Sequence, residues 1–161
     1  MKEVNLYIGI TAHGPRKQDG AYGWVLELVR AGGSPYTKEG FGVREDVTDR
    51  DLALEALAEA LEHFKEACSI RIILSPSYMA ETFPTPWTEG WVQKWKENGW
   101  KNSKGKEIVH ADLWEKAEAA LRKHEAVFCP KGVKNSYANW ISDETKRRTH
   151  RILGKKEETG T

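Results

Sequence analysis

The order of its strand-like and helix-like segments is the feature that most constrains how this chain folds. Residues 4–43 contain three stretches that are rich in β-branched and aromatic residues and are separated by turn-forming residues. Such stretches are typical of β-strands, and their short connections predict an antiparallel meander. The three predicted strands are Val4–Ile10, Tyr22–Arg30 and Tyr36–Val43.

A helix and a fourth strand are expected next. Thr48 or Asp49 can cap a helix whose apolar stripe continues to Ala67, and the short apolar segment Ile70–Leu74 follows it. A strand that follows a helix in this way typically crosses over to lie parallel to an earlier strand. We therefore expect the fourth strand to be parallel to one of the first three.

The second half of the chain is mainly helical in its pattern of apolar residues. Glycine and proline punctuate that pattern and mark where one element ends and the next begins. The predicted elements are helices at Ser77–Thr82, Glu89–Asn98, Leu113–Lys123 and Asn139–Ile152, and a strand at Glu125–Cys129. No linker divides the series, so we expect one domain over residues 1–153 and a flexible C-terminal tail over residues 154–161.

Composition narrows the function classes without selecting one. The net charge of +1 gives no general attraction to nucleic acid, so any basic binding surface must be local. Cys68 and Cys129 are too few for a disulfide framework or a zinc cluster, and each adjoins an apolar run, which favours buried reduced thiols. We find neither a signal-peptide pattern nor an apolar run of about 20 residues, and we expect an intracellular, cytoplasmic protein, with nucleoid or nuclear association also open.

Two motifs resemble those of a known enzyme family. Residues 91–101 follow the pattern W-x3-W-K-x2-G-W-K, and a loop with lysines and a glycine then leads to D-L-W at residues 112–114. Residues 20–23, G-A-Y-G, begin the second predicted strand. With the order of elements, these motifs resemble bacterial type 1 ribonuclease H over residues 4–150. The resemblance implies an α/β, ribonuclease H-like fold, with a mixed five-stranded sheet (three antiparallel strands, then parallel strands), flanking helices and a basic protrusion.

The resemblance also implies an activity, namely hydrolysis of the RNA strand of an RNA–DNA hybrid. The family holds two Mg²⁺ ions between clustered carboxylates, the oxygen ligands that this hard cation requires. Most of those carboxylates are replaced here. The positions of the family's acids are occupied by Gly9 or Ile10 on the first strand, Ala53 on the first helix, Ser75 after the fourth strand and Asp143 on the last helix, while Val133 stands where the family has a mobile histidine.

The replacement of three carboxylates predicts that the metal pair and catalysis are lost. Asp143 alone cannot hold two dications, so we expect no cofactor, no metal site and no catalytic residues. Asp51 and Glu55 each lie two positions from Ala53, where the turn of a helix directs their side chains elsewhere. The alternative, an active Mg²⁺-dependent RNA–DNA hybrid endoribonuclease with a rearranged metal site, stays open.

We expect the protein to bind nucleic acid although catalysis is lost. The predicted protrusion carries five lysines against two glutamates, a local net charge of +3. Lysines neutralise phosphates, and aromatic faces can line a groove for nucleotides, although packing against the body is the favoured role of the tryptophans. The last predicted helix also has a basic second half, which suits the negative end of a helix and requires no ligand. The candidate nucleic-acid-binding residues are Thr48, Arg50, Ser77, Trp91, Lys94, Trp95, Lys96, Lys101 and Lys104.

Three functional hypotheses follow from these observations. The first is a catalytically inactive ribonuclease H-like protein that binds an RNA–DNA hybrid or another duplex, alone or beside a polymerase, a reverse transcriptase or another protein subunit. The second is a scaffold or protein-interaction subunit that binds no nucleic acid. The third is the enzyme with a rearranged metal site. None of the three involves a membrane.

Overall fold

A five-stranded sheet in the order β3-β2-β1-β4-β5 forms the centre of the molecule. The structure is a computed structural model that describes the backbone of residues 1–159 and the side chains of residues 1–154. The strands are β1 (Lys2–Ile10), β2 (Gln18–Leu28), β3 (Tyr36–Val47), β4 (Cys68–Ser75) and β5 (Glu125–Phe128). The helices are α1 (Asp49–Leu61), α2 (Met79–Thr82), α3 (Thr85–Thr88), α4 (Trp91–Glu97), α5 (Ala111–Leu121) and α6 (Ala138–Thr159).

The pairing of the strands is the one that the resemblance implied. The central strand β1 pairs antiparallel with β2 and parallel with β4. At the two sides of the sheet, β2 and β3 are antiparallel, and β4 and β5 are parallel. The prediction of a mixed five-stranded sheet and an α/β, ribonuclease H-like fold is therefore confirmed.

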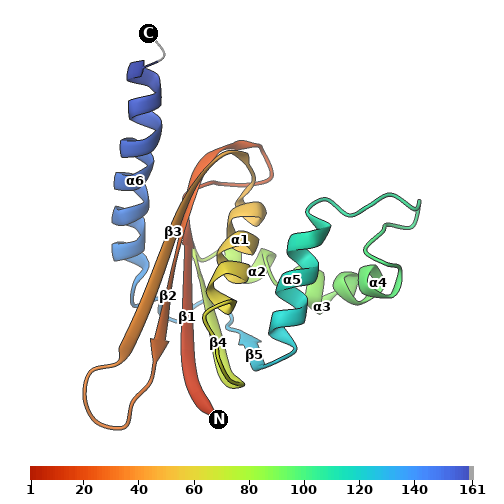
Figure 1. Cartoon of the computed structure of the whole chain (residues 1–161), viewed down its shortest axis with the longest axis horizontal. Helices are drawn as coiled ribbons and strands as arrows, with labels where there is room; N and C mark the ends of the chain where they lie inside the picture. Colours follow the sequence, from red (N-terminus) through yellow and green to blue (C-terminus); the bar gives the residue numbers. More distant parts are fainter. Residues whose placement is uncertain (160–161) are drawn as a thin grey trace.

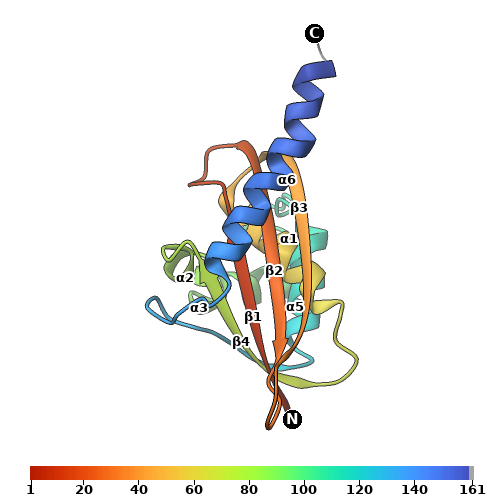
Figure 2. The same cartoon turned by 90° about the vertical axis from the view of Figure 1, so that its left-hand side faces the viewer.

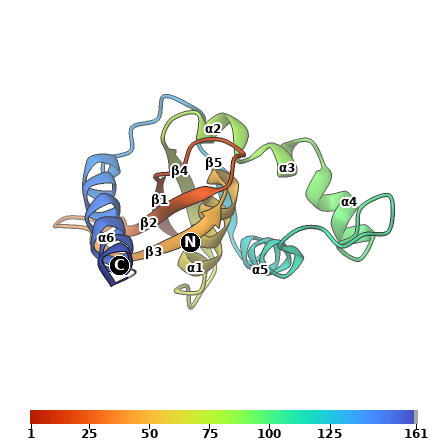
Figure 3. The same cartoon turned by 90° about the horizontal axis from the view of Figure 1, so that it is seen from above.

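The helices form layers on the two faces of the sheet (Figures 1 and 3). Helices α1 and α5 cover one face, and α4 lies beyond α5 at the side of the molecule, while α6 alone covers the other face. The alternation of side chains along each strand separates two cores. On β1, Leu6 and Ile8 belong to the large core under α1, and Tyr7 belongs to a smaller core under α6. Figure 2 shows α6 crossing its face and continuing past the end of the sheet.

Several predicted bounds were wrong. Strand β2 begins at Gln18 and ends at Leu28 rather than at Tyr22 and Arg30, and β3 continues to Val47 rather than Val43. The first helix ends at Leu61 rather than Ala67, because the next two backbone N–H groups bond to carbonyls three residues earlier and tighten the last turn. The single turn α3 was not predicted, although proline is tolerated at such a helix start. Helix α6 extends to Thr159, since Lys and Glu favour helices and Gly154 costs only about 1 kcal/mol. The backbone of the expected tail is thus helical up to Thr159, and residues 160–161 lie outside the described residues.

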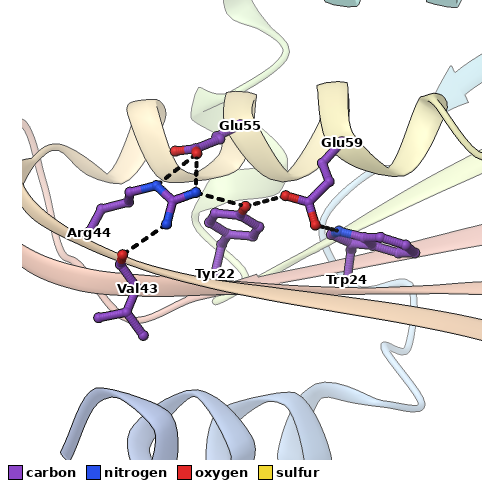
Figure 4. Close-up of polar contacts among 6 residues, drawn as sticks. All are labelled: Tyr22, Trp24, Val43, Arg44, Glu55 and Glu59. Atoms are coloured by element: carbon purple, nitrogen blue, oxygen red, sulfur yellow. Dashed lines mark hydrogen bonds and ion pairs between the residues drawn. The ribbon is translucent and has the colours of Figure 1, made fainter. Parts of the chain in front are cut away.

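Partly buried polar contacts hold α1 on β2 and β3 (Figure 4). The Glu59 carboxylate accepts hydrogen bonds from the Tyr22 hydroxyl and, at 3.1 Å, from Nε1 of Trp24. Nε of Arg44 donates to Glu55 at 2.7 Å. Burial, and then the hydrogen bond to Glu59, raise the pKa of Tyr22. Hydrogen bonds to a charged group contribute about 1.5–3 kcal/mol each, so these contacts fix the rotation of α1 on the sheet.

The glycines of β3 make room for the two aromatic rings in this network. Tyr22 pairs with Gly42 across the β2–β3 ladder, and Trp24 pairs with Gly40. A Cβ atom placed on either glycine would lie 2.4 Å from a ring atom of its partner. Both rings are fully buried between the sheet and α1. The glycine content that made β3 a weak strand in the sequence is therefore required by how β2 packs.

Two predictions from composition can be compared with the structure. Cys68 and Cys129 are free thiols and both are buried, as expected. Within the part of the chain that the structure describes, no helix combines the length and the apolar character that crossing a membrane requires.

Candidate functional site

The position of the family's first acid can be located from the strand pairing. Gly9 of β1 lies beside Ser75 of β4 in the parallel ladder, and Ser75 is the residue at the position of the family's third acid. The two positions are therefore neighbours on the sheet, which selects Gly9 rather than Ile10. Ile10 points to the opposite face and packs against the large core.

The space in front of Gly9 is filled by α6. A Cβ atom placed on Gly9 would lie 2.7 Å from Cγ2 of Ile141 and 3.2 Å from Oγ of Ser75. A Cβ atom on the neighbouring Gly23 would lie 2.8 Å from the same Cγ2. Ile141 itself is almost completely buried, with 1% of its surface exposed. This corner of the sheet is thus an apolar contact between a helix and glycine backbone.

The other positions of the family's acids, and that of its histidine, have different surroundings from one another. Ala53 is fully buried in the large core, on the α1 side of the sheet. Asp143 lies on α6 two residues after Ile141, and it is exposed because residues two positions apart point to different sides of a helix. Val133 packs against the small core under α6. Of this set, Gly9 and Ser75 are the two that pair directly in the sheet.

The donor atoms at these positions do not fit the family's pair of Mg²⁺ ions. Each ion requires several oxygen ligands, and carboxylates supply the negative charge that holds two dications near each other. Ser75 offers one neutral hydroxyl, which lies 3.4 Å from the carbonyl oxygen of Ile8. Among the described residues, no group of three or more His, Cys, Asp and Glu side chains is arranged to hold a metal ion.

The two acids that flank Ala53 have other partners. Asp51 completes a capping box at the start of α1, where it accepts the backbone N–H of Thr48 at 2.9 Å. Its other carboxylate oxygen lies 3.2 Å from Nε2 of His110. Glu55 is bound to Arg44. Neither carboxylate is directed at Gly9 or Ser75, which gives the alternative of a rearranged site no support from these two residues.

The start of α1 forms a second candidate region, next to a cavity of about 460 Å³. The Asp49 carboxylate accepts the Tyr78 hydroxyl at 2.9 Å and the backbone N–H of Gly14 at 3.1 Å. Burial, and then the hydrogen bond to Asp49, raise the pKa of Tyr78. These neutral donors orient the Asp49 carboxylate but do not cancel a negative charge on this surface.

The predicted binding residues Thr48, Arg50 and Ser77 lie around this region. Oγ1 of Thr48 accepts the backbone N–H of Asp51 at 3.1 Å, which leaves the hydroxyl proton available to an acceptor such as a phosphate oxygen. Nη2 of Arg50 lies 3.4 Å from the carbonyl oxygen of Thr82, a long contact that leaves most of its donors unused. Ser77 is exposed just before α2. The α1 start therefore presents one hydroxyl and one guanidinium to solvent.

The basic protrusion, residues 91–107, comprises α4 and the loop after it. Its candidate lysines are all exposed, and none of them takes part in an ion pair within the described residues. They are Lys94, Lys96, Lys101 and Lys104, and Lys106 is exposed with them. Asn98 holds the loop through its side-chain amide, which donates to two loop carbonyls at 3.1 Å. Free cations on an ordered element suit a polyanionic ligand.

The tryptophans of the protrusion divide into two kinds. Trp95 and Trp100 are partly buried and pack against the large core, and the ring of Trp95 lies 5.3 Å from that of the buried Trp114. Trp91 is 38% exposed, with its ring 6.4 Å from that of Trp95. Packing is thus the main role of Trp95 and Trp100, as the alternative reading of the sequence favoured. Of the three, Trp91 is the one that reaches the surface most, with 38% of it exposed.

Two contacts that sequence reasoning missed connect these surfaces. The ion pair between His110 and Asp51 joins the segment after the protrusion to the start of α1. The Asp49–Tyr78–Gly14 contacts join α1 to the β1–β2 connection and to the segment after β4. The partners are far apart in the chain and follow no local spacing rule. Neither the periodicity of apolar residues nor a sequence motif could therefore have revealed these two contacts.

Known proteins share this architecture. The family model described as RNase H matches residues 8–149. The ribonuclease H of Caldicellulosiruptor saccharolyticus is 30% identical over 148 residues, which cover 91% of this chain and 95% of the relative. LC9-RNase H1, a type 1 RNase H with the type 2 active-site motif, has a TM-score of 0.67 at 19% identity, covering 92% of this chain and 72% of its own. A foamy viral protease–reverse transcriptase in complex with an RNA/DNA hybrid has a TM-score of 0.62 at 16% identity, covering 92% of this chain and 20% of that one.

The two structural similarities concern the fold, because their sequence identities are low. The family model adds a match in sequence that spans most of the chain, and the bacterial relative matches over nearly its whole length. The fold, the protrusion and the strand order all agree with that match. The chain therefore belongs to the RNase H family.

Proposed function

We propose that this protein is a catalytically inactive member of the RNase H family that binds nucleic acid, either an RNA–DNA hybrid or another duplex. The observation that carries the proposal is the contact of Ile141 with Gly9 beside Ser75. An apolar side chain and a glycine stand where the reaction needs carboxylates and space for hydrated cations. The basic protrusion, in contrast, keeps a full set of exposed lysines.

The missing carboxylates remove most of the electrostatic attraction that would hold two Mg²⁺ ions. At about 4 Å and an effective dielectric constant near 20, two unit charges attract by about 4 kcal/mol, and a dication doubles that value. Three carboxylates are missing from the positions where the family has them. Each missing carboxylate removes an attraction of this size to a metal ion. Replacement of the lost oxygens by the Ser75 hydroxyl supplies no charge. These residues therefore cannot hold the metal ions that would activate water to attack a phosphodiester.

Exposed lysines on the protrusion and a partly exposed arginine at the start of α1 support binding. The protrusion offers lysines for phosphate contacts, and the start of α1 adds the Thr48 hydroxyl and the Arg50 guanidinium. Each phosphate that a lysine neutralises releases condensed counterions, so the affinity should fall steeply as the salt concentration rises. Because such contacts address the backbone rather than base edges, we expect little dependence on base sequence.

A role within a larger assembly forms part of the same proposal. The foamy viral structure shows this fold inside a protease–reverse transcriptase in complex with an RNA/DNA hybrid. By analogy, a polymerase, a reverse transcriptase or another nucleic-acid-processing subunit is the expected class of protein partner. A scaffold that binds no nucleic acid is the alternative, and direct binding measurements distinguish the two.

Activity is the second candidate, and the name of the relatives favours it, since they are called ribonuclease H. An assay on a labelled RNA–DNA hybrid with Mg²⁺ or Mn²⁺ tests it, with Asp143→Asn as the control for contaminating host enzyme. We expect no cleavage above that of the control. Cleavage by the wild-type protein that Asp143→Asn abolishes would overturn the proposal of inactivity.

Binding is tested separately, by titrating hybrid, double-stranded DNA and double-stranded RNA at low salt. We expect micromolar or tighter binding of the hybrid that Lys94→Gln/Lys96→Gln weakens. Lys65→Gln/Lys123→Gln is the matched control, because it removes the same charge from exposed lysines on another part of the molecule. Absence of binding, or equal weakening by both double variants, would contradict a specific role of the protrusion.

A further inference from the structure

We infer that the outward face of α6 is a second surface that binds the phosphate backbone of nucleic acid, separate from the protrusion. This inference rests on the proposed nucleic-acid binding and extends it to a part of the molecule that the family resemblance does not address. Some side chains of α6 face the sheet and others face solvent, and the two sets differ in charge.

Burial defines the two faces of α6. Ile141 and Thr145, one helical turn apart, are each 1% exposed and point to the sheet. The side chains on the opposite face are exposed. A helix places residues three and four apart on one side, so these side chains form a continuous stripe. Its basic members are Lys146, Arg147, His150 and Arg151, and the exposed Asp143 lies one turn before them on the same face.

The charge of this segment is concentrated and of one sign. Between Thr145 and Gly154 there are four Lys or Arg residues and no acid, although the whole chain has a net charge of only +1. Glu144, just before the segment, is largely buried and pairs with Arg147 at 2.7 Å and with Arg148 at 3.3 Å. Lys146 and Arg151 take part in no ion pair within the described residues.

One basic residue of the segment has a structural role and is left out of the proposed surface. The guanidinium of Arg148 lies 4.2 Å from the centre of the Phe41 ring, and it also contacts Glu144. Such a cation–π contact stabilises the docking of α6 on β3. The outward residues Lys146 and Arg151 have no comparable partner among the described side chains.

The helix dipole does not account for the stripe. Favourable interaction with the negative end of a helix falls off within the last turn. Helix α6 continues to Thr159, and Lys146 and Arg147 lie about three turns before that end. The sequence-based reading that a basic helix end needs no ligand assumed that the helix stopped near Ile152. The longer helix removes that explanation for these two residues.

Location and chemistry favour nucleic acid as the ligand. The sheet separates α6 from α1, α5 and the protrusion, and α6 projects past the end of the sheet (Figures 2 and 3). Among the described residues of α6, Trp140 (40%) and Ile152 (52%) are exposed large apolar side chains. Two separate side chains do not form the continuous apolar face with which a helix binds a lipid surface. Its cations recur on successive turns about 5.4 Å apart. A duplex carries one negative charge per about 1.7 Å of its axis. Its phosphates can therefore contact the cations of two successive turns of α6 at once.

The test compares three double variants by hybrid affinity at several salt concentrations. Lys146→Gln/Arg151→Gln removes the two charges of the stripe that are in no ion pair among the described residues, and Lys94→Gln/Lys96→Gln removes two charges of the protrusion. Lys65→Gln/Lys123→Gln changes the net charge equally elsewhere. Each phosphate contact contributes about 0.9 to the slope of log K against log salt. We expect the stripe variant to lose about tenfold in affinity at low salt and to lower that slope by about 2. Lys146→Arg/Arg151→Lys should bind as the wild type does.

The outcomes separate this inference from the proposed function. Equal losses for the stripe variant and the Lys65/Lys123 control would reduce the effect to net charge and overturn the inference. A loss in the protrusion variant with none in the stripe variant would overturn the inference and leave the proposed function standing. No binding by the wild-type protein would overturn both. Thermal melting of each variant shows whether a lost affinity merely reflects lost folding.

Discussion

Ile141 on α6 and Gly9 on β1 are in direct contact, since a Cβ atom on Gly9 would lie 2.7 Å from Cγ2 of Ile141. This contact closes the corner of the sheet that Ser75 shares. Glycine permits the close approach of α6, and isoleucine uses it to bury an apolar side chain. The absence of a side chain at Gly9 and the tight packing of the helix are therefore linked.

A double-mutant cycle tests that linkage. Gly9→Ala should destabilise the protein by about 1–3 kcal/mol, because overpacking forces α6 or β1 to move. Ile141→Ala should also destabilise it, by about 2–5 kcal/mol, through loss of buried surface and cavity formation. In the double variant the new methyl group enters the space that Ile141 left, so the two losses should sum to more than the measured effect. Urea denaturation measures all three, and strictly additive losses would show that the residues do not compete for space.

Alkaline pH should destabilise the contact between the β5–α6 connection and the sheet. The Tyr137 hydroxyl donates to Glu27 at 2.7 Å. Burial, and then this hydrogen bond, raise the pKa of Tyr137 to about 12. The folded state thus retains the proton longer than the unfolded state, whose tyrosine has a pKa near 10.0. The associated stability is fully present below pH 10 and is lost as the pH rises from there towards 12.

Melting temperatures of the wild type and Tyr137→Phe between pH 8 and pH 11 measure this effect. The phenylalanine variant should be less stable at pH 8, and its stability should decline less between pH 10 and 11. Tyr36→Phe is the control, because Tyr36 is largely exposed on β3 and has no hydrogen bond to an acid among the described contacts. Parallel curves for the wild type and Tyr137→Phe would argue against the Tyr137–Glu27 contact.

Acidic pH should destabilise the junction of β4 and α5. Nδ1 of His124 accepts the backbone N–H of Cys68 at 3.1 Å, which requires a neutral ring at that nitrogen. Burial, and then the charge of Lys123, lower the pKa of His124 from its ordinary value of 6.5. The unfolded state therefore binds a proton at a higher pH than the folded state does. The stability is present above pH 6.5 and decreases as the pH falls below it.

NMR titration of the imidazoles and urea denaturation between pH 5 and 8 check this prediction. The His124 resonance should titrate below the ordinary histidine value of 6.5. A His124→Gln variant should show a flatter dependence of stability on pH below 6.5 than the wild type, whereas His150→Gln should not. A His124 resonance that titrates at or above 6.5 would contradict the proposed burial and acceptor role.

Much of the fold could be predicted from the sequence, because alternation along strands and leucine periodicity are local properties. The motif of residues 91–101 also located the protrusion, whereas the assignment of residues to the positions of the family's acids stays a prediction. What could not be predicted depends on distant pairs. Ile141 meets Gly9 only after the last helix crosses the sheet, and nothing in the spacing of residues 138–152 shows which side Asp143 will face. The hydrogen bonds from Tyr22 and Trp24 to Glu59 are hidden for the same reason, since they join residues that are 37 and 35 positions apart.

The tryptophans of the protrusion should separate stability from binding. Trp95→Ala should destabilise the protein by about 2–3 kcal/mol, somewhat less than the ~3–5 kcal/mol of a fully buried tryptophan, because its ring packs on Trp114. Trp91→Ala should cost under about 1 kcal/mol of stability, since much of its ring stays exposed, but should weaken hybrid binding. Urea denaturation and hybrid titration of both variants give the two readouts. Comparable losses of stability in both would show that Trp91 packs as Trp95 does.

Restoring acids should harm this protein rather than restore a metal site. Ala53 is fully buried, and Ser75 lies against the backbone of β1 beside Gly9. Ala53→Glu/Ser75→Asp places one charge in an apolar core and another beside the Ile141 contact, so the melting temperature should fall by at least about 5 °C. Millimolar Mg²⁺ should raise the melting temperature of neither the wild type nor this variant beyond an NaCl control of equal ionic strength. A site whose Kd for Mg²⁺ is one hundredth of the Mg²⁺ concentration would stabilise the folded state by about 2.7 kcal/mol. A thermal melt detects a change of that size readily. Mg²⁺-specific stabilisation of the wild type would reveal a metal site built from other residues, and that result would reopen the case for catalysis.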